Sequence, residues 1–157
     1  MKLSTVTRYG LRALSDLCAQ EKLQGENKPV AVGDIARRQE IPPSYLEQLF
    51  AKLRRGRLIK SVRGAQGGYV LARPAKEITV AEIIRALGEP IAFGDCQTDA
   101  GCRRDTSTCC TYELWRKLKG SVDEILESTT LEDITGKNTE VPSQEEFFNG
   151  RLSTHAE

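Results

Sequence analysis

Four of the five cysteines fall within fifteen residues, at Cys96, Cys102, Cys109 and Cys110, in the segment CQTDAGCRRDTSTCC. This segment is polar and contains glycine and threonine, whereas cysteines buried for packing usually lie on apolar faces. The cluster therefore indicates a metal site, a disulfide or a redox-active thiol. The fifth cysteine, Cys18, lies on the apolar stripe of a predicted helix, and we expect it in the core.

The spacing of the clustered cysteines favours an iron–sulfur cluster over zinc. The gaps between Cys96, Cys102 and Cys109 are five and six residues, whereas zinc sites typically space paired cysteines by about two to four residues. Thiolates on an irregular loop suit an iron–sulfur cluster. A metal-free thiol switch and a purely structural role stay open. The adjacent Cys109 and Cys110 support the switch, as do the cationic Arg103 and Arg104, which favour thiolates nearby.

Whole-chain features exclude several classes of protein. The chain of 157 residues suits one domain, and it contains no apolar run of about 18 residues that would span a membrane. The start, MKLSTVTRYGLRAL, lacks the features of a signal peptide. We therefore expect a cytoplasmic protein, in which thiols stay reduced. A Cys-x-x-Cys pair, a nucleotide fingerprint and paired catalytic carboxylates are not evident, so we expect no enzyme.

Charge is distributed unevenly, although the net charge is only +1. Residues 28–76 contain eleven Lys and Arg against three Asp and Glu, whereas residues 77–157 contain eight Lys and Arg against sixteen Asp and Glu. A basic half joined to an acidic half indicates a polyanion partner for the first. The alternative is two ordinary solvated surfaces.

Apolar periodicity and turn signals predict a mainly α fold with a small β-hairpin, arranged as a winged helix-turn-helix plus a long helix, whose apolar stripe alone would equally suit the core of a monomer. Ser44 and Thr79 are expected to cap helices. The helices are expected over about 4–21, 32–39, 44–55, 80–87, 112–128 and 131–135, and the strands over 58–62 and 69–72, with the glycine-rich hairpin tip RGAQGG between them.

The helix over 44–55 would enter the major groove, because its apolar stripe of Leu46, Leu49, Phe50 and Leu53 leaves a polar outer face. Glutamine pairs with adenine and glutamate accepts from cytosine N4. We expect phosphate contacts from Lys52, Arg54, Arg55, Arg57 and Lys60. The glycines of the hairpin tip let the backbone approach a narrow groove that Arg63 can enter. A solvated helix face and a plain hairpin turn are the alternatives.

Three segments carry a family resemblance: MKLSTVTRYGLRAL, SYLEQLFAKLRRGRLIKSVRGAQGGYVLARP and ITVAEIIRAL. Over about residues 1–130 they resemble the iron–sulfur cluster assembly regulators of the IscR type and their winged-helix relatives of the CymR and NsrR types. The resemblance implies a homodimer that binds palindromic operators in double-stranded DNA, and it makes the long helix over 112–128 the dimerisation helix. On the outer face of the helix over 44–55 and on the hairpin tip, the residues expected to bind DNA are Ser44, Tyr45, Glu47, Gln48, Lys52, Arg55, Arg63, Gly64 and Gln66.

The resemblance also implies a [2Fe-2S] cluster held by Cys96, Cys102 and Cys109, and a regulator of cluster-assembly genes. The fourth ligand stays open, because Tyr112 stands where IscR-type proteins have histidine and Arg8 where NsrR-type proteins have aspartate. Cys110, Glu113, a group of the partner chain or a small molecule are the candidates. The alternative functions are a metal-free thiol redox-sensing repressor and a CymR-type regulator of cysteine and sulfur metabolism genes.

These expectations divide the chain into four regions. Residues 1–90 form the DNA-binding winged helix-turn-helix, and residues 91–110 form the cysteine-rich loop that binds the cluster. Residues 111–135 form the dimerisation helix, and residues 136–157 form a polar tail that we expect to be flexible.

Overall fold

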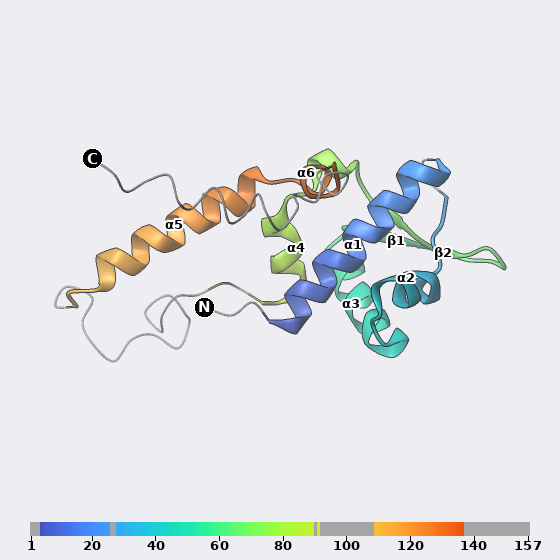
Figure 1. The fold of residues 1–157 in the computed structure, drawn as a ribbon, viewed down its shortest axis with the longest axis horizontal. Coiled ribbons are helices and arrows are strands. Elements are labelled where there is room, and N and C mark those ends of the chain that lie inside the picture. The colour runs from blue at the N-terminus through green and yellow to red at the C-terminus, as the bar shows by residue number, and fades with distance from the viewer. Residues whose placement is uncertain (1–3, 26–27, 90, 92–108, 137–157) are drawn as a thin grey trace, which may run out of the picture.

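The computed structural model describes residues 4–25, 28–89, 91 and 109–136, and the fold is given for these residues. Their elements run in the order α1 (Thr5–Gln24), α2 (Val32–Gln39), α3 (Pro43–Arg55), β1 (Ile59–Val62), β2 (Gly68–Leu71), η1 (Ala75–Glu77), α4 (Val80–Leu87), α5 (Tyr112–Ser128) and α6 (Leu131–Gly136). Figure 1 shows a body made of α1 to α4, α6 and the hairpin, from which α5 extends to one side and the hairpin tip to the other. The prediction of a mainly α fold with a small antiparallel hairpin is confirmed.

The core lies where α1, α2, α3 and α4 meet the base of the hairpin. The largest fully buried side chain is Phe50, which packs edge-on against Tyr69 of β2 with ring centroids 4.9 Å apart. The predicted stripe of α3 is buried as expected, and Cys18 of α1 is 2% exposed and belongs to the core. The apolar burial of α3 fixes which of its faces is left to solvent.

Local signals explain where most helices begin and end. Ser4 caps α1 by accepting a hydrogen bond from the Thr7 backbone N–H at 3.1 Å. Thr79 and Glu82 form a capping box at the start of α4, so the predicted cap at Thr79 is confirmed. The predicted cap at Ser44 is wrong. The helix α3 begins at Pro43 with Pro42 as its N-cap, because proline's fixed φ suits the first turn.

The helix α2 is held on α1 by a partly buried ion pair. Arg38 donates to both carboxylate oxygens of Asp16, at 2.6 to 3.1 Å, and Gln39 donates to the same carboxylate at 2.8 Å. The Asp16 side chain is 5% exposed. The hydrogen bond from Arg38 to Asp16 raises the pKa of the guanidinium above its ordinary value. This pair fixes the first helix of the helix-turn-helix on α1.

The segment after α5 returns to the body and pairs with the start of α4. An isolated antiparallel bridge joins Thr79 to Thr130. The Val80 N–H donates to the Thr129 carbonyl at 2.9 Å, and the Leu131 N–H donates to the Ile78 carbonyl at 2.8 Å. Leu131 is fully buried. The base of α5 is therefore attached to α4 by backbone hydrogen bonds.

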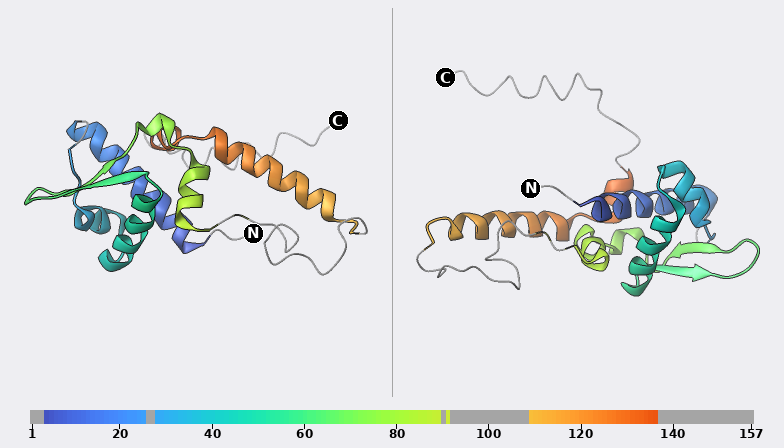
Figure 2. Two further views of the ribbon diagram at one scale, coloured as in Figure 1. Left: turned by 180° about the vertical axis from the view of Figure 1, so that it is seen from behind. Right: turned by 90° about the horizontal axis from the view of Figure 1, so that it is seen from below.

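The long helix α5 buries none of its residues. Leu114, Leu118 and Ile125 are 53%, 39% and 61% exposed, so an apolar face of this helix is uncovered in the single chain. The two views of Figure 2 show that α5 projects away from the body, with the hairpin tip at the opposite end. Among the described helices, none is both long enough and apolar enough to cross a membrane.

Candidate nucleic-acid interface

The solvent face of α3 carries the side chains that the sequence predicts for base contact. Ser44, Glu47 and Gln48 are all exposed, in the first two turns of the helix. Glu47 and Gln48 have no side-chain hydrogen bond or ion pair to any described residue. These donors and acceptors are therefore available to base edges, the arrangement that direct readout in a major groove requires.

Tyr45 occupies a different position from its neighbours. Its ring is half-buried and packs edge-on against Tyr9 of α1, with centroids 6.0 Å apart and an interplanar angle of 80°. Arg12 of α1 lies 5.7 Å from the centre of the same Tyr9 ring and donates to Gln39 at the end of α2. Tyr45 thus joins α3 to α1 as well as lining the edge of the exposed face.

The basic residues of α3 divide into two groups. Arg54 and Arg55 are exposed, and neither side chain has a partner among the described residues. Lys52 is half-buried, and its ammonium donates to the Leu87 carbonyl oxygen at the end of α4, at 2.9 Å. The phosphate contact predicted for Lys52 stays a prediction, but the structure gives this cation a partner inside the protein.

The β-hairpin forms the wing. Its strands pair antiparallel, with Ile59 opposite Leu71 and Val62 opposite Gly68. Arg63, Gly64 and Gln66 lie exposed at the tip, as the sequence predicts. Gly64 has φ +120°, a conformation that side-chain-bearing residues rarely adopt. The tip is therefore slim and presents Arg63 to solvent.

The base of the wing is fixed by the segment before α2. Val30 and Tyr69 exchange backbone hydrogen bonds of 2.9 and 3.0 Å. A Cβ on Gly68 would lie 2.3 Å from the Val30 carbonyl oxygen, so only glycine permits this approach. On the other side, the Glu21 carboxylate accepts from the Leu71 N–H at 2.7 Å. These contacts set the angle at which the wing leaves the body.

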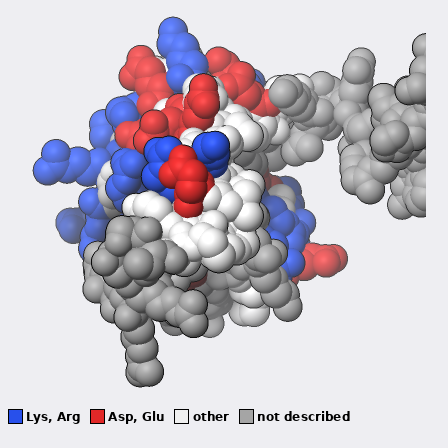
Figure 3. All heavy atoms as spheres, turned by 90° about the vertical axis from the view of Figure 1, so that its left-hand side faces the viewer, with Lys and Arg blue, Asp and Glu red and all other residues white. Residues whose placement is uncertain are grey.

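The excess of basic residues belongs to the elements of the candidate interface. Residues 28–76, which contain α2, α3 and the hairpin, carry eleven Lys and Arg against three Asp and Glu. Figure 3 shows the opposite end of the molecule, from which α5 projects, and there Lys and Arg lie beside Asp and Glu. A basic surface beside an exposed helix and a slim wing is the electrostatic arrangement expected for a duplex partner.

The predicted cluster ligands are only partly described. Cys96 and Cys102 lie outside the described residues. Cys109 is half-buried just before α5, with its sulfur 3.5 Å from the Thr111 hydroxyl, and Cys110 is exposed. Within the described ranges no group of three or more His, Cys, Asp or Glu is placed to hold a metal. Cys109 suits a ligand role, because a thiolate is favoured beside the N-terminus of a helix.

Two candidates for the fourth ligand differ in their surroundings. The Glu113 carboxylate accepts two hydrogen bonds from Arg116, at 2.6 and 2.8 Å, and this pairing lowers the pKa of Glu113 below its ordinary value. Glu113 would have to leave Arg116 to bind a metal. Cys110 is exposed, but it follows Cys109 directly, and successive side chains diverge.

Sequence reasoning missed two features of this surface. One is the hydrogen bond of Lys52 to Leu87, a residue 35 positions away that no local pattern connects to α3. The other is Arg57, which has a left-handed backbone with φ +58°. The sequence does contain a signal for the left-handed turn at Arg57. Helices often end with a glycine in the left-handed conformation, and a glycine, Gly56, stands one residue before Arg57.

Comparison with known proteins agrees with this geometry. The family model Rrf2, described as an iron-dependent transcriptional regulator, matches residues 3–137. The chain is 44% identical over 138 residues to an HTH-type transcriptional regulator, ORF2, of Azotobacter vinelandii, covering 88% of this chain and 81% of that protein. The structure of T. potens IscR matches with a TM-score of 0.70 and 38% identity, covering 94% and 96% of the two chains. CymR, the global cysteine regulator of B. subtilis, matches with a TM-score of 0.71 and 36% identity, covering 87% and 97%.

Proposed function

Because this chain belongs to the Rrf2 family of transcriptional regulators, we propose that it is an IscR-type homodimer whose binding to operator DNA responds to a [2Fe-2S] cluster. Its membership makes it a DNA-binding regulator with the winged-helix fold of IscR and CymR. The bound cluster, the dimer and the control of cluster-assembly genes go beyond what family membership shows, and we propose them for this chain.

Base reading is assigned to the first half of α3. Gln48 can pair with adenine, Glu47 can accept from a cytosine amino group, and the Ser44 hydroxyl can donate to or accept from a base edge. Their exposure on a helix whose opposite face is fully buried supports this assignment. Tyr45 sits at the edge of this face and fixes its orientation through Tyr9.

The wing and the basic end of α3 are assigned to the DNA backbone and minor groove. Arg63 extends from the tip, where Gly64 keeps the loop narrow enough to approach the groove and Gln66 lies exposed beside it. Arg55 supplies positive charge for a phosphate and thus salt-dependent affinity. These contacts position the duplex, whereas α3 specifies the sequence.

Dimerisation is assigned to α5. This helix presents Leu114, Leu118 and Ile125 to solvent, and a second α5 packed antiparallel would cover all three side chains. Two-fold symmetry would then place two recognition helices on a palindromic operator, with half-sites about one helical turn, or ~10 bp, apart.

Cys96, Cys102 and Cys109 are assigned as the cluster ligands, with the fourth open between Cys110, Glu113, a partner-chain group and a small molecule. A bound cluster would supply a group whose presence depends on iron supply and oxidation. The chain connects this segment to α3 by two routes. Lys52 is bonded to the last carbonyl of α4, where the segment begins, and Thr129 to Leu131 join the far end of α5 to the start of α4.

The observation that carries the proposal is the exposed polar face of α3 beside an arginine-tipped wing. Selection of binding sites from a random duplex library, with anaerobically prepared protein, tests it. We expect a palindrome whose footprint covers both half-sites, and an affinity that falls steeply with salt. A footprint of one half-site without salt dependence would contradict it.

A second candidate is a metal-free thiol sensor that regulates cysteine or sulfur metabolism. The adjacent thiols of Cys109 and Cys110, one of them exposed, favour it, and so does the match to a cysteine regulator. Anaerobic reconstitution with iron and sulfide separates the two functions. Colourless protein whose DNA affinity changes on treatment with peroxide would favour the thiol sensor.

A further inference from the structure

Arg57 has a backbone conformation that strongly favours glycine. It follows the C-cap residue Gly56 of α3 and has φ +58°. The Arg57 N–H donates to the Arg54 carbonyl and the Leu58 N–H donates to the Leu53 carbonyl, both at 3.0 Å. This pair of bonds is a Schellman motif, and its left-handed position is most often glycine, because a Cβ is unfavourable there.

Gly56, the glycine of this turn, precedes the left-handed residue Arg57, and it is required for a separate reason. A Cβ on Gly56 would lie 2.6 Å from the Cβ of Ala86 in α4, so residue 56 must be small for α3 to pack on α4. That contact does not explain arginine at 57, whose side chain is exposed and has no partner among the described residues. The fold at residue 57 would be served better by glycine, so the reason for arginine lies in its side chain.

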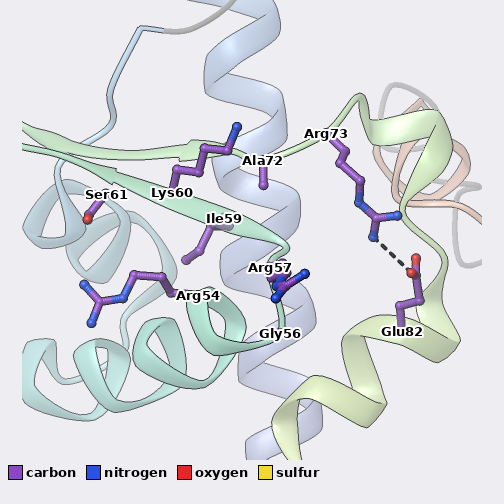
Figure 4. Close-up of a pocket in the computed structure, with 9 residues that line it drawn as sticks. All are labelled: Arg54, Gly56, Arg57, Ile59, Lys60, Ser61, Ala72, Arg73 and Glu82. Carbon is purple, nitrogen blue, oxygen red and sulfur yellow. Dashed lines mark hydrogen bonds and ion pairs between the residues drawn. The ribbon is translucent and has the colours of Figure 1, made fainter.

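The Arg57 side chain lines a basic groove between the end of α3, strand β1 and the start of α4. Figure 4 shows Arg57 between Arg54, which extends along the space between α3 and β1, and the Arg73–Glu82 pair. The groove is lined by Arg54, Gly56, Arg57, Ile59, Lys60, Ser61, Ala72, Arg73 and Glu82.

The charge of this groove is strongly positive. The only carboxylate lining it, Glu82, accepts from Arg73 at 3.0 Å and from the Thr79 N–H at 3.1 Å. Burial alone would raise the pKa of Glu82, but these two hydrogen bonds, together with the positive charges of Arg73 and Arg85, lower the pKa below its ordinary value. Arg54, Arg57 and Lys60 have no such partner among the described residues. Three cations are left to meet an anion.

We propose that this groove is a phosphate site for the sugar–phosphate backbone of DNA, with Arg57 as its central ligand. The proposal rests on the proposed function and deepens it, because it places the phosphate contacts expected from the sequence in one groove and gives Arg57 the central role there. The groove lies between α3 and β1, the two elements assigned to the duplex. Ile59 and Ala72 give it an apolar floor, which suits a backbone that alternates anionic phosphates with apolar sugar faces.

The test compares Arg57→Gly with Glu40→Gly. Glu40 ends α2 with the same left-handed backbone, φ 53°, in a Schellman motif of its own, closed by the Ile41 N–H to the Ala36 carbonyl. Relief of the backbone should raise Tm in both variants by about 2–4 °C. Arg57→Gly should weaken duplex binding about fivefold or more at low salt. It should also reduce the slope of log affinity against log salt concentration by about one, because one phosphate contact is lost. Glu40→Gly should bind the duplex at least as tightly as wild type.

A charge-retaining variant and a measurement with inorganic phosphate distinguish a DNA phosphate site from the alternatives. Arg57→Lys, which keeps the charge, should restore most of the affinity and the salt slope. If Arg57→Gly lowers Tm, or binds the duplex as wild type does, the phosphate site is refuted. Inorganic phosphate that stabilises wild type but not Arg57→Gly, without any difference in duplex binding, would assign the groove to a free anion and overturn the DNA assignment. If wild type shows no salt-dependent duplex binding, the proposed function itself fails.

Discussion

The Lys52 ammonium of α3 donates a 2.9 Å hydrogen bond to the carbonyl oxygen of Leu87, the last residue of α4. A cation at that position also interacts favourably with the negative end of the α4 helix dipole. The same two helices meet at Gly56 and Ala86, where no room exists for a further Cβ. The recognition helix and the end of α4 are therefore held as one unit, directly before the segment that leads to the cysteines.

Replacement of Lys52 by methionine should lower the free energy of unfolding by about 1–2 kcal/mol, because a buried carbonyl loses a charged donor. It should also weaken operator binding, and the slope of log affinity against log salt separates the two roles of Lys52, because an unchanged slope assigns the lysine to the packing of α3 on α4. Chemical denaturation and salt titrations of operator affinity measure both effects. Lys76→Met, at an exposed position of η1, is the matched control. A slope reduced by about one ion would instead assign Lys52 to a phosphate.

The sequence predicted the helices and the wing to within a few residues, because each has a local signal. The stripe of α3 has helical spacing, and Thr79 with Glu82 is a capping box that can be recognised in four residues. The start of α3 was predicted one residue late, because a serine at the second helical position resembled a cap and the proline pair before it was the actual boundary.

The contacts that position the site are not local and were not predicted. Lys52 and Leu87 are 35 residues apart, and Glu21 and Leu71 are 50 apart. Such pairs depend on how the helices pack, which periodicity does not encode. The exposed residues of α3 could be predicted because one buried stripe fixes the opposite face. The sequence does not distinguish Lys52 from Arg54. The structure does, because Lys52 donates to the Leu87 carbonyl, whereas the Arg54 side chain has no partner among the described residues.

Glu47 should act as a selector among operators, since a carboxylate near the groove is repelled by phosphates and acceptor-rich bases and is tolerated where a cytosine amino group meets it. Glu47→Ala should widen the range of duplexes bound, with little loss on the best one. Binding of a library of single-base operator variants measures this range. A loss of about 1–3 kcal/mol on the best operator would mean that Glu47 makes a favourable bidentate-type contact. An equal loss on all operators would mean that it is structural.

The uncovered face of α5 should carry the dimer. Ile125→Glu should convert the dimer to monomer at micromolar concentration, because a charge placed in an apolar interface has no partner. Light scattering after size-exclusion chromatography measures the mass. Leu23→Glu, at an apolar side chain of α1 that is 79% exposed, is the control and should leave the mass unchanged. If the Ile125 variant stays dimeric, the dimer interface lies elsewhere.

Cys96, Cys102 and Cys109 should each be required for the cluster. Anaerobic reconstitution of wild type should give visible absorption bands and about two irons per chain, as a [2Fe-2S] cluster requires. Cys96→Ala, Cys102→Ala and Cys109→Ala should each abolish the bands, whereas the effect of Cys110→Ala decides whether Cys110 is the fourth ligand. Loss of the bands in Cys110→Ala but not in Cys109→Ala would shift the third ligand by one position. Colourless protein that holds one zinc would rule out the cluster.

The central claim is that occupancy of the cysteine segment controls duplex binding by α3 and the wing. The most direct measurement is the Kd of one selected operator duplex, at fixed salt, for apo protein and for protein reconstituted under anaerobic conditions. We predict that the two values differ by about tenfold or more, and that Cys109→Ala gives the apo value under both conditions. Equal values for the two wild-type preparations, with the cluster present in one of them, would contradict the claim.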